Sequence, residues 1–289
     1  MKTKILTFSQ LQEAARLLYQ GQLVAIPTET VYGLAALISS ESAISSIFAV
    51  KKRPADNPLI VHIANLKQLD QIALPPSKLF FQLTEAFFPG PLTMIIPRHR
   101  DLSPLISAGL DSVAIRMPAH PIAMDLIQML EVPIVAPSAN LSGRPSATDM
   151  QHVLDDFDQK ISAVIDGGRS TFGVESTVIS LLSNPPVILR PGNITKQEIE
   201  NVLGRTIDVQ ISLQKGPFYS PGMKYRHYAP CIPIKLLYEK EQINFYCKRA
   251  DSNKRMLLST SSLFIENCDY YKLNTQDLYA CFRHAEKNG

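Results

Sequence analysis

Short apolar segments alternate with helix-like segments through the first two thirds of the chain, and this alternation constrains the fold more than any other feature. The apolar segments are too short for buried helices and are typical of strands inside a sheet. The helix-like segments carry apolar residues at helical spacing, as Leu11, Ala14 and Leu18 do. The pattern predicts an α/β fold in which an open twisted mixed sheet is covered by flanking helices.

The predicted segments end at proline, glycine or capping residues. The predicted helices cover residues 10–19, 41–50, 77–88, 122–130 and 196–203. The predicted strands cover residues 23–26, 59–64, 92–96, 113–116, 134–136, 163–165, 178–182 and 187–189. A stretch rich in Pro and Gly over 208–233 indicates a linker, so we predict one domain over 1–207 and a smaller unit over 234–289.

The smaller unit begins with a predicted strand from Ile234 (IKLLY), contains a short MLLSTS stretch and closes with a predicted helix over 276–284. A unit of this size buries too small a fraction of its surface to be stable alone. We therefore expect it to pack against the first domain.

Composition excludes several classes of protein. The chain is 45% hydrophobic and 19% charged, an ordinary globular balance. No apolar run approaches the roughly 20 residues of a membrane span, and the N-terminus lacks the apolar stretch of a signal peptide. We expect a cytoplasmic protein with no membrane contact. The cysteines show no zinc spacing and are expected to be reduced thiols; they are Cys231, Cys247, Cys268 and Cys281.

The charge balance argues against an extended nucleic-acid surface. Residues 1–220 hold 18 Lys and Arg against 19 Asp and Glu, a net of −1, and residues 221–289 hold 11 against 7, a net of +4. Nucleic-acid binding needs a clustered basic face, which this excess is too small to predict.

Polar residues follow several predicted strands, where open α/β sheets bind ligands. Thr28 and Thr30 come after the strand 23–26 and either contact a ligand or form a turn that ends the strand. Lys51 and Arg53 end a helix, where they either bind a polyphosphate or complement the helix dipole. His62, inside an apolar strand, is more often a satisfied core residue than a ligand contact.

Other candidates also remain open at this level. Arg116 closes a buried strand and needs a carboxylate partner, from either the protein or a substrate. Ser138 and Asn140 either bind a nucleotide or cap a turn. Glu29 and Glu175 lie near these motifs, but no nucleophile–base pair is evident. P-loop, Rossmann, zincin and serine-hydrolase motifs are absent. Cations and donors without such a pair suit phosphoryl or nucleotidyl transfer.

The motifs together resemble those of the YrdC-type threonylcarbamoyl-AMP synthases. They are, in order, PTETVYGL, KKRPADNPLIVHI, FFPGPLT, VAIRMPAHP, APSANLSGRPS, VIDGG, GVESTV and ILRPGNIT. The string SPGMKYRHYAP resembles the linker of the two-domain members, and the segment after it resembles a shortened Rossmann-like C-terminal domain. The resemblance implies a YrdC-like sheet over residues 1–207.

The resemblance also implies an activity. Members of the family make L-threonylcarbamoyl-AMP from L-threonine, bicarbonate or CO2, and ATP, and release pyrophosphate. Magnesium is expected with the ATP, and no metal site of the protein's own is expected. The product serves the threonylcarbamoyl-adenosine modification of tRNA, which separate transferase proteins complete, so stable direct tRNA binding is not expected.

Residue roles follow from the same resemblance. The K-x-R motif falls on Lys51 and Arg53, the expected catalytic residues, and the S-x-N motif on Ser138 and Asn140. The residues expected to bind ATP are Lys51, Arg53, Asn57, Ser138, Asn140 and Arg190. The residues expected to bind threonine are Thr28, His62, Arg116, Ser176 and Thr177. The residues expected to form a lid over the pocket are Tyr225, His227 and Tyr228.

Three other functions compete with this one. An RNA-binding module of the same fold would bind RNA weakly and salt-sensitively without turning over ATP. A paralogue with another substrate is disfavoured by the intact K-x-R and S-x-N motifs. An accessory domain of the hydrogenase-maturation type would need flanking zinc-finger and acylphosphatase regions, which the sequence lacks.

Overall fold

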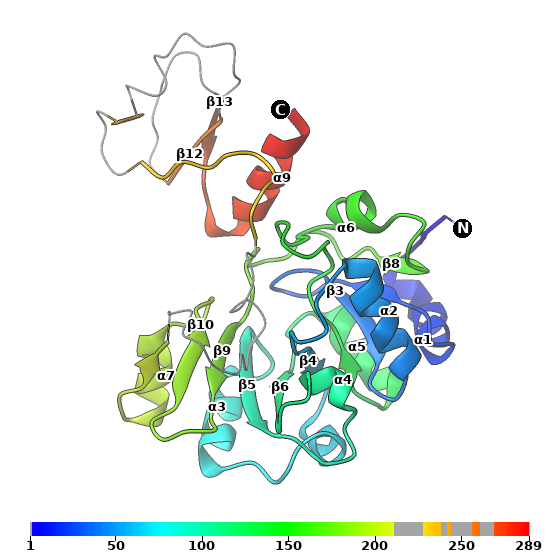
Figure 1. Ribbon diagram of the computed structural model, residues 1–289, viewed down its shortest axis with the longest axis vertical. Helices are drawn as coiled ribbons and strands as arrows, with labels where there is room; N and C mark the ends of the chain where they lie inside the picture. The colour runs from blue at the N-terminus through cyan, green and yellow to red at the C-terminus, as the bar shows by residue number, and fades with distance from the viewer. Residues whose placement is uncertain (1, 211–227, 238–241, 244–255, 261–268, 289) are drawn as a thin grey trace.

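The computed structural model describes residues 2–210, 228–237, 242–243, 256–260 and 269–288. Figure 1 shows a large lower part, which runs from the N-terminus to α7, and a smaller C-terminal part that stands on it beside α6. Within the described residues, no helix is both long and apolar enough to cross a membrane.

An 11-stranded mixed sheet runs through the larger part. Its strands, in chain order, are β1 (Lys4–Leu6), β2 (Val24–Ile26), β3 (Gly33–Leu37), β4 (Ile60–His62), β5 (Leu92–Pro97), β6 (Ser112–Arg116), β7 (Ile134–Val135), β8 (Ala163–Ile165), β9 (Thr177–Ser180), β10 (Val187–Arg190) and β11 (Asp208–Val209). Their order across the sheet is β1-β8-β2-β3-β7-β4-β6-β5-β9-β10-β11. Most strands are buried on both faces, which explains their continuous apolar sequences.

Helices cover both faces of this sheet. They are α1 (Leu11–Tyr19), α2 (Glu41–Lys51), α3 (Lys78–Phe87), α4 (Pro104–Ser107), α5 (Pro121–Leu130), α6 (Met150–Phe157) and α7 (Lys196–Leu203). One core cluster joins α1 and α5 to the sheet, and a larger one joins the other five helices to it. The predicted α/β fold with an open mixed sheet and flanking helices is therefore confirmed.

Local sequence signals explain where the helices begin and end. The hydroxyl of Ser40 accepts a hydrogen bond from the backbone N–H of Ala43 at 3.3 Å and so caps α2. Thr195 and Glu198 form a reciprocal capping box at the start of α7. Gly204 ends α7 at a positive φ of 64°, which glycine adopts without strain. These caps lie within a residue or two of the predicted helix ends.

The structure differs from the sequence prediction at several elements. In the larger part, strands β1 and β3 and helices α4 and α6 were not predicted. The residues of β11, which we assigned to the linker, pair in parallel with β10 and extend the sheet. The strand predicted from Ile234 is wrong over 234–237, where the backbone forms no strand. The last residue of the predicted strand lies outside the described residues.

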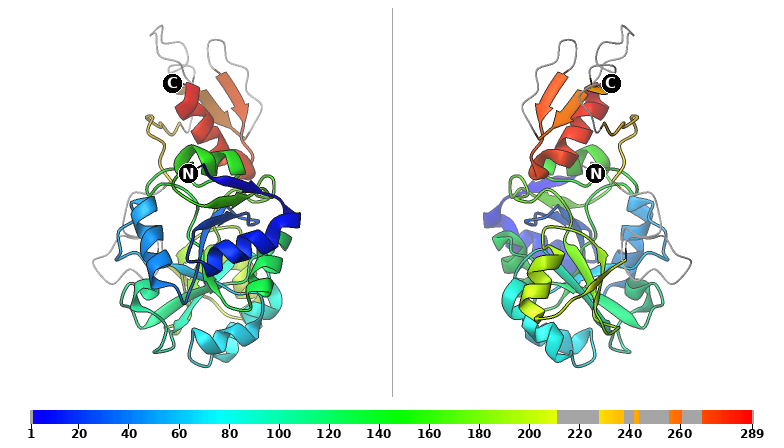
Figure 2. Two further views of the ribbon diagram at one scale, coloured as in Figure 1. Left: turned by 90° about the vertical axis from the view of Figure 1, so that its right-hand side faces the viewer. Right: turned by 90° about the vertical axis from the view of Figure 1, so that its left-hand side faces the viewer.

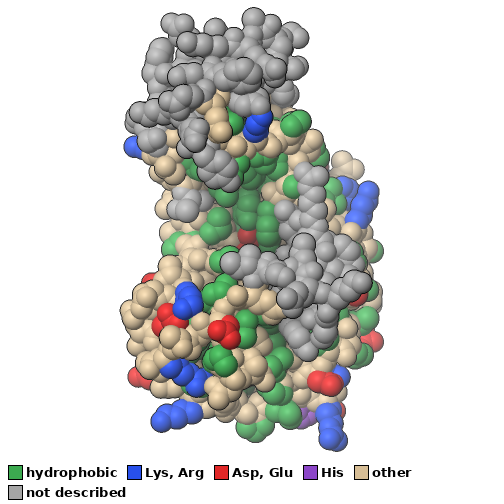
Figure 3. Space-filling view, turned by 60° about the vertical axis from the view of Figure 1, so that its left-hand side comes forward, with side chains coloured by type: hydrophobic (Ala, Val, Ile, Leu, Met, Phe, Trp, Pro, Cys, Tyr) green, Lys and Arg blue, Asp and Glu red, His purple; other side chains and the backbone are tan. Residues whose placement is uncertain are grey.

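The described C-terminal part consists of a parallel strand pair, β12 (Met256–Ser259) and β13 (Asp269–Lys272), followed by α9 (Leu278–Asn288). Both views in Figure 2 show α9 close to α6. In Figure 3 the molecule narrows at the junction of the two parts, and hydrophobic side chains gather there. The expected packing against the larger part is confirmed by Tyr279 and Arg283 of α9, which are buried and hydrogen-bonded to its residues.

Candidate functional site

A pocket lies where the ends of several strands meet the loop that follows β7. Ten of the residues proposed from the sequence line it: Thr28, Lys51, Arg53, His62, Arg116, Ser138, Asn140, Ser176, Arg190 and Tyr228. Sheet register explains part of this convergence, because His62 and Arg116 are direct partners at the ends of the parallel strands β4 and β6. Residues distant in sequence thus share one cavity.

Thr28 forms the turn that the sequence allowed and also faces the pocket. Its hydroxyl donates to the carbonyl of Val31 at 2.6 Å and accepts from the backbone N–H groups of Thr30 and Val31. This turn also directs the hydroxyl of Thr30 toward Arg116. The two readings of this motif are therefore compatible, because one hydroxyl supports the turn while its side chain lines the cavity.

Arg116 has a carboxylate partner within the protein. Its Nη2 lies 2.7 Å from Oε1 of Glu29, and its Nη1 donates to the hydroxyl of Thr30 at 2.8 Å. Both charged side chains are buried. Next to them, burial and then the charge of Arg116 lower the pKa of His62 to about 3, so its imidazole is neutral at physiological pH. This side of the pocket presents one oriented cation and a neutral ring.

Lys51 lies at the end of α2, and 1% of its surface is exposed. Its ammonium donates to the carbonyl oxygens of Ser138 and Asn140, the latter at 2.6 Å. Burial lowers the pKa of Lys51 well below its usual value, and Arg53 lowers it further. A desolvated cation that the backbone already holds in position is prepared to bind an anion.

Arg53 follows Lys51 and is held by backbone oxygens. Its Nη2 donates to the carbonyl of Pro58 at 2.8 Å and its Nε to that of Asn57 at 3.3 Å. Burial lowers the pKa of Arg53 to about 10, which leaves the guanidinium charged at neutral pH. Two cations of one short motif therefore line the same cavity.

Arg190 is a further cation in the pocket lining. Arg190 donates through Nε and Nη2 to the carbonyl of Ser176, and Nη1 lies 3.4 Å from the hydroxyl of Tyr228. The ring of Tyr228 stacks on that of Tyr279 with centroids 5.6 Å apart. The hydroxyl of Tyr279 donates to Oε2 of Glu175 at 2.6 Å. Helix α9 thereby reaches a side chain of the pocket.

Two proposed residues lie outside the pocket lining, and two others lie outside the described residues. Asn57 is buried outside the lining and contributes its backbone oxygen to Arg53. Thr177 is also outside the lining, because its hydroxyl is engaged by the backbone of Ile194 at 2.6 and 3.1 Å. Tyr225 and His227 lie outside the described residues.

The structure adds residues that sequence reasoning did not assign to the site. Glu175 and Arg144 line the pocket, and Tyr279 bonds to Glu175 from behind. The sequence could have identified Glu175 as a pocket residue, because it directly precedes Ser176 in the motif GVESTV. Arg144 follows the S-x-N motif within SGRPS. Tyr279 carries no local signal, because only the packing of α9 brings it near.

The donor set indicates what the pocket can bind. Five cationic side chains and several hydroxyls line one cavity, which suits anionic groups such as phosphates and carboxylates; the cations are Lys51, Arg53, Arg116, Arg144 and Arg190. Its carboxylate, Glu175, uses both oxygens to accept from Ser146 and Tyr279. Among the described residues, no group of three or more His, Cys, Asp or Glu side chains could hold a metal ion.

Two family models match the chain. The model for Sua5, YciO and YrdC proteins, described as telomere recombination, matches residues 16–192. The model for the C-terminal domain of threonylcarbamoyl-AMP synthase matches residues 194–289.

Curated relatives carry the same description. The threonylcarbamoyl-AMP synthase of Bacillus subtilis is 50% identical over 229 residues, which cover 78% of this chain and 66% of the relative. That of Pyrococcus abyssi is 50% identical over 223 residues, covering 76% of this chain and 66% of the relative. The matched region thus spans just under two thirds of either relative.

Solved structures share the fold. The crystal structure of P. abyssi Sua5 complexed with L-threonine matches with a TM-score of 0.91 and 40% identity, over 99% of this chain and 90% of that one. Escherichia coli YciO matches with a TM-score of 0.62 at 20% identity, over 68% of this chain and 99% of that one, and shares the fold alone. With its motifs, its pocket and a family model that covers more than half of its length, this chain belongs to the Sua5/YciO/YrdC family.

Proposed function

We propose that this protein synthesises L-threonylcarbamoyl-AMP from L-threonine, bicarbonate or CO2, and ATP, with release of pyrophosphate. The observation that carries the proposal is the convergence of Lys51, Arg53 and Arg116 on one pocket with hydroxyl donors between them. A reaction that joins an amino-acid carbamate to a nucleotide needs cations at two places, for a carboxylate and for a triphosphate. The relatives named threonylcarbamoyl-AMP synthase support the same activity.

In this proposal the two substrates occupy opposite sides of the pocket. L-Threonine binds near Thr28, His62 and Arg116, where a neutral imidazole and an oriented guanidinium suit a zwitterion with an apolar methyl group. ATP binds along the wall formed by Lys51, Arg53, Ser138, Asn140 and Arg190. The solved relative complexed with L-threonine supports an amino-acid subsite in this fold.

The proposed roles of Asn57 and Thr177 are indirect. Asn57 helps to hold Arg53 through its carbonyl oxygen, and Thr177 holds the backbone of Ile194 beside Ser176. Tyr228, at the wall of the pocket, is proposed to close over the substrates together with Tyr225 and His227. A closed pocket protects the carbamate and the mixed anhydride, which water would hydrolyse.

The proposed chemistry has two steps. The threonine amine adds to CO2 and loses a proton, which gives an N-carboxylate. An oxygen of this carboxylate attacks the α-phosphorus of ATP, the bond to the bridging oxygen breaks, and pyrophosphate leaves. Lys51 and Arg53 stabilise the negative charge that develops on the phosphate oxygens. No protein nucleophile is needed, which agrees with the side chains that line the pocket.

Magnesium is proposed to enter with ATP. The carboxylate of Glu175 already accepts hydrogen bonds at both oxygens, so this lining suits a metal that arrives on the triphosphate better than a resident one. We further propose that residues 1–207 together with strand β11 form the catalytic domain, the rest of 208–233 the linker and 234–289 the C-terminal unit. The product would pass to separate tRNA threonylcarbamoyl transferase proteins in the cytoplasm, without stable tRNA binding by this chain.

The test is to incubate the purified protein with ATP, magnesium, L-threonine and bicarbonate and to follow pyrophosphate together with the mass of the product. Pyrophosphate release that requires both threonine and bicarbonate, with the adenylate mass present, is the expected result. ATP binding without release in the presence of all substrates would contradict the activity of this chain. Salt-sensitive RNA binding without ATP binding would instead favour the RNA-binding module.

A further inference from the structure

Helix α9 contacts the larger part of the protein through a cluster of four charged side chains, which we call the Asp156 cluster: Arg144, Asp156, Arg283 and Glu286. Asp156 and Arg283 are buried, and 31% of the Arg144 side chain is exposed. Oδ1 of Asp156 lies 2.6 Å from Nη1 of Arg144, and Oδ2 lies 2.8 Å from Nη2 of Arg283. The carboxylate of Glu286 lies 2.7 Å from Nη2 of Arg144. Two cations and two carboxylates thus balance, which allows Asp156 and Arg283 to be buried.

The cluster contacts the middle and the last residue of a short loop, residues 138–145. The backbone N–H of Leu141 donates to Oδ2 of Asp156 at 3.0 Å. Arg283 donates to the carbonyl oxygen of Pro145 from Nε and Nη2, at 3.1 and 2.7 Å. Asp156 is on α6 and Arg283 is on α9. Residues 138–145, called the 138–145 loop below, therefore depend on both helices for their position.

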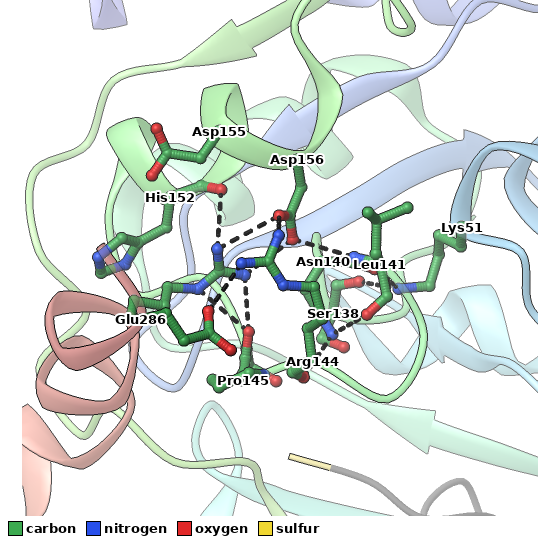
Figure 4. Close-up of polar contacts among 12 residues, drawn as sticks. Lys51, Ser138, Asn140, Leu141, Arg144, Pro145, His152, Asp155, Asp156 and Glu286 are labelled. Atoms are coloured by element: carbon green, nitrogen blue, oxygen red, sulfur yellow. Dashed lines mark hydrogen bonds and ion pairs between the residues drawn. The ribbon is translucent and has the colours of Figure 1, made fainter. Parts of the chain in front are cut away.

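The same loop holds Lys51 on its other side. The ammonium of Lys51 donates to the carbonyl oxygens of Ser138 and Asn140, and its own carbonyl accepts from the backbone N–H of Ser142 at 2.9 Å. Figure 4 shows Lys51 pointing toward Ser138 and Asn140, while Asp156 lies on the opposite side of the loop. A displacement of the loop would move both carbonyl oxygens that orient the ammonium.

Arg283 does not line the pocket. Its side chain is buried, with 2% of the residue's surface exposed, and its hydrogen bonds end at the loop and at α6. Its forked guanidinium contacts a carboxylate and a backbone carbonyl together, a geometry that a lysine ammonium cannot reproduce. Its position between α9 and the loop is therefore specific to arginine.

We propose that Arg283 is a positioning residue that couples α9 to Lys51 through the 138–145 loop, so that docking of the C-terminal unit prepares the pocket to bind the nucleotide. The functional part of this inference rests on the proposed function, because it takes ATP as the ligand of Lys51. Its structural part, that Arg283 orders the loop, concerns the protein without any ligand.

The test compares the full-length protein with Arg283→Met, which keeps most of the volume and removes the fork. Two readouts are measured: the Kd values for ATP and for L-threonine separately, and the hydrogen exchange of the Leu141 and Ser142 amides without ligand. The expected result is an ATP affinity at least about 10-fold weaker, the scale of losing one oriented charged contact. Threonine affinity is expected to stay within twofold, and both amides are expected to exchange faster.

Two further variants separate positioning from general damage. Arg283→Lys keeps the charge and is expected to fold, with an ATP affinity between wild type and Arg283→Met. Lys287→Met is the matched control, because Lys287 is on the same helix and pairs with Asp155 on α6 at 2.6 Å without touching the loop. It is expected to leave both affinities and both amides unchanged.

Each outcome bears on the inference. Wild-type exchange at Leu141 and Ser142 in Arg283→Lys and Arg283→Met would overturn it, whether or not the protein binds ATP. Equal losses of ATP and threonine affinity, or the same losses in Lys287→Met, would show a general structural role and would also overturn it. A wild type that binds no ATP, with amides that still respond to Arg283→Met, would retain the ordering of the loop and refute the proposed function.

Discussion

Arg116 donates from Nη2 to Oε1 of Glu29 at 2.7 Å, and the two side chains are buried together where Arg116 lines the pocket. The same guanidinium donates to the hydroxyl of Thr30, so its plane is set before any substrate arrives. In the described structure, Oε2 of Glu29 has no hydrogen-bond partner. A substrate carboxylate would therefore share the guanidinium with Glu29 rather than find it unpaired.

This pair predicts a strong effect on stability. Glu29→Ala leaves the Arg116 charge buried without its carboxylate and is expected to lower the free energy of unfolding by about 3 kcal/mol. The double variant Glu29→Ala/Arg116→Met is expected to lose less than the sum of the two single variants, because the partners act together. Urea denaturation of the four proteins measures this coupling, and additive losses would show that the pair is not energetically linked.

Arg53 is predicted to act in catalysis. Arg53→Ala is expected to lower kcat/KM for adenylate synthesis by about 10² or more, the scale of losing one transition-state charge contact. The matched control is Lys52→Asn, because Lys52 is exposed and has a positive φ of 51°, which asparagine tolerates. Pyrophosphate release provides the rate. Near-normal turnover in Arg53→Ala would remove Arg53 from the mechanism.

His62 predicts a loss of stability in acid. Burial and the nearby Arg116 charge lower its pKa from 6.5 to about 3, so between these pH values only the unfolded chain binds the proton. The contribution of His62 to the free energy of unfolding is complete above its unfolded pKa. Below that pKa, it falls by about 1.4 kcal/mol for each pH unit of acidification. Denaturation of His62→Gln over this range is expected to give a shallower pH slope than wild type.

A second buried histidine provides the comparison for that experiment. Burial lowers the pKa of His152 to about 4, so protonation of His152 also makes the free energy of unfolding fall as the pH decreases. His152→Gln should therefore reduce the slope as well, and the double variant should reduce it more than either single one. If His62→Gln kept the full wild-type slope, the protonation of His62 would not contribute to acid unfolding.

Lys51 predicts how ATP binding depends on pH. Burial, followed by the charge of Arg53, lowers its pKa in the free protein. A bound triphosphate would raise this pKa, so ATP binding should take up a proton once the pH exceeds the free value. Affinity should then fall as the pH rises above the pKa of Lys51 in the free protein. Calorimetry in buffers of different ionisation enthalpy measures the proton uptake, which Lys51→Met should abolish.

The hydroxyl of Tyr279 predicts a stabilising contact between α9 and the pocket. Tyr279→Phe leaves Oε2 of Glu175 without this donor and is expected to lower the free energy of unfolding by about 2 kcal/mol. Tyr271→Phe is the control, since the Tyr271 hydroxyl contacts the exposed His284. Thermal or urea denaturation compares the two variants. Equal effects would mean that the Glu175 contact adds no stability.

The elements that were found from sequence are those with strong local signals. Helix α2 was predicted over 41–50 because Ser40 caps it and its apolar residues repeat at helical spacing. Strand β3 was missed because its residues, GLAAL, follow a polar motif and are helix-compatible by composition. The strand predicted at 234–237 had a favourable local sequence, but no neighbouring strand pairs with it in the described structure.

Sequence by itself determined the α/β class, the polar motifs at strand ends and ten of the residues that line the pocket, because each depends on residue types and on short-range spacing. Tertiary structure decided their partners. It paired Arg116 with Glu29, turned the Thr177 hydroxyl toward Ile194 and brought Tyr279 to Glu175. These contacts join residues that are far apart in the chain, and only sheet order and helix packing bring such residues within hydrogen-bond distance.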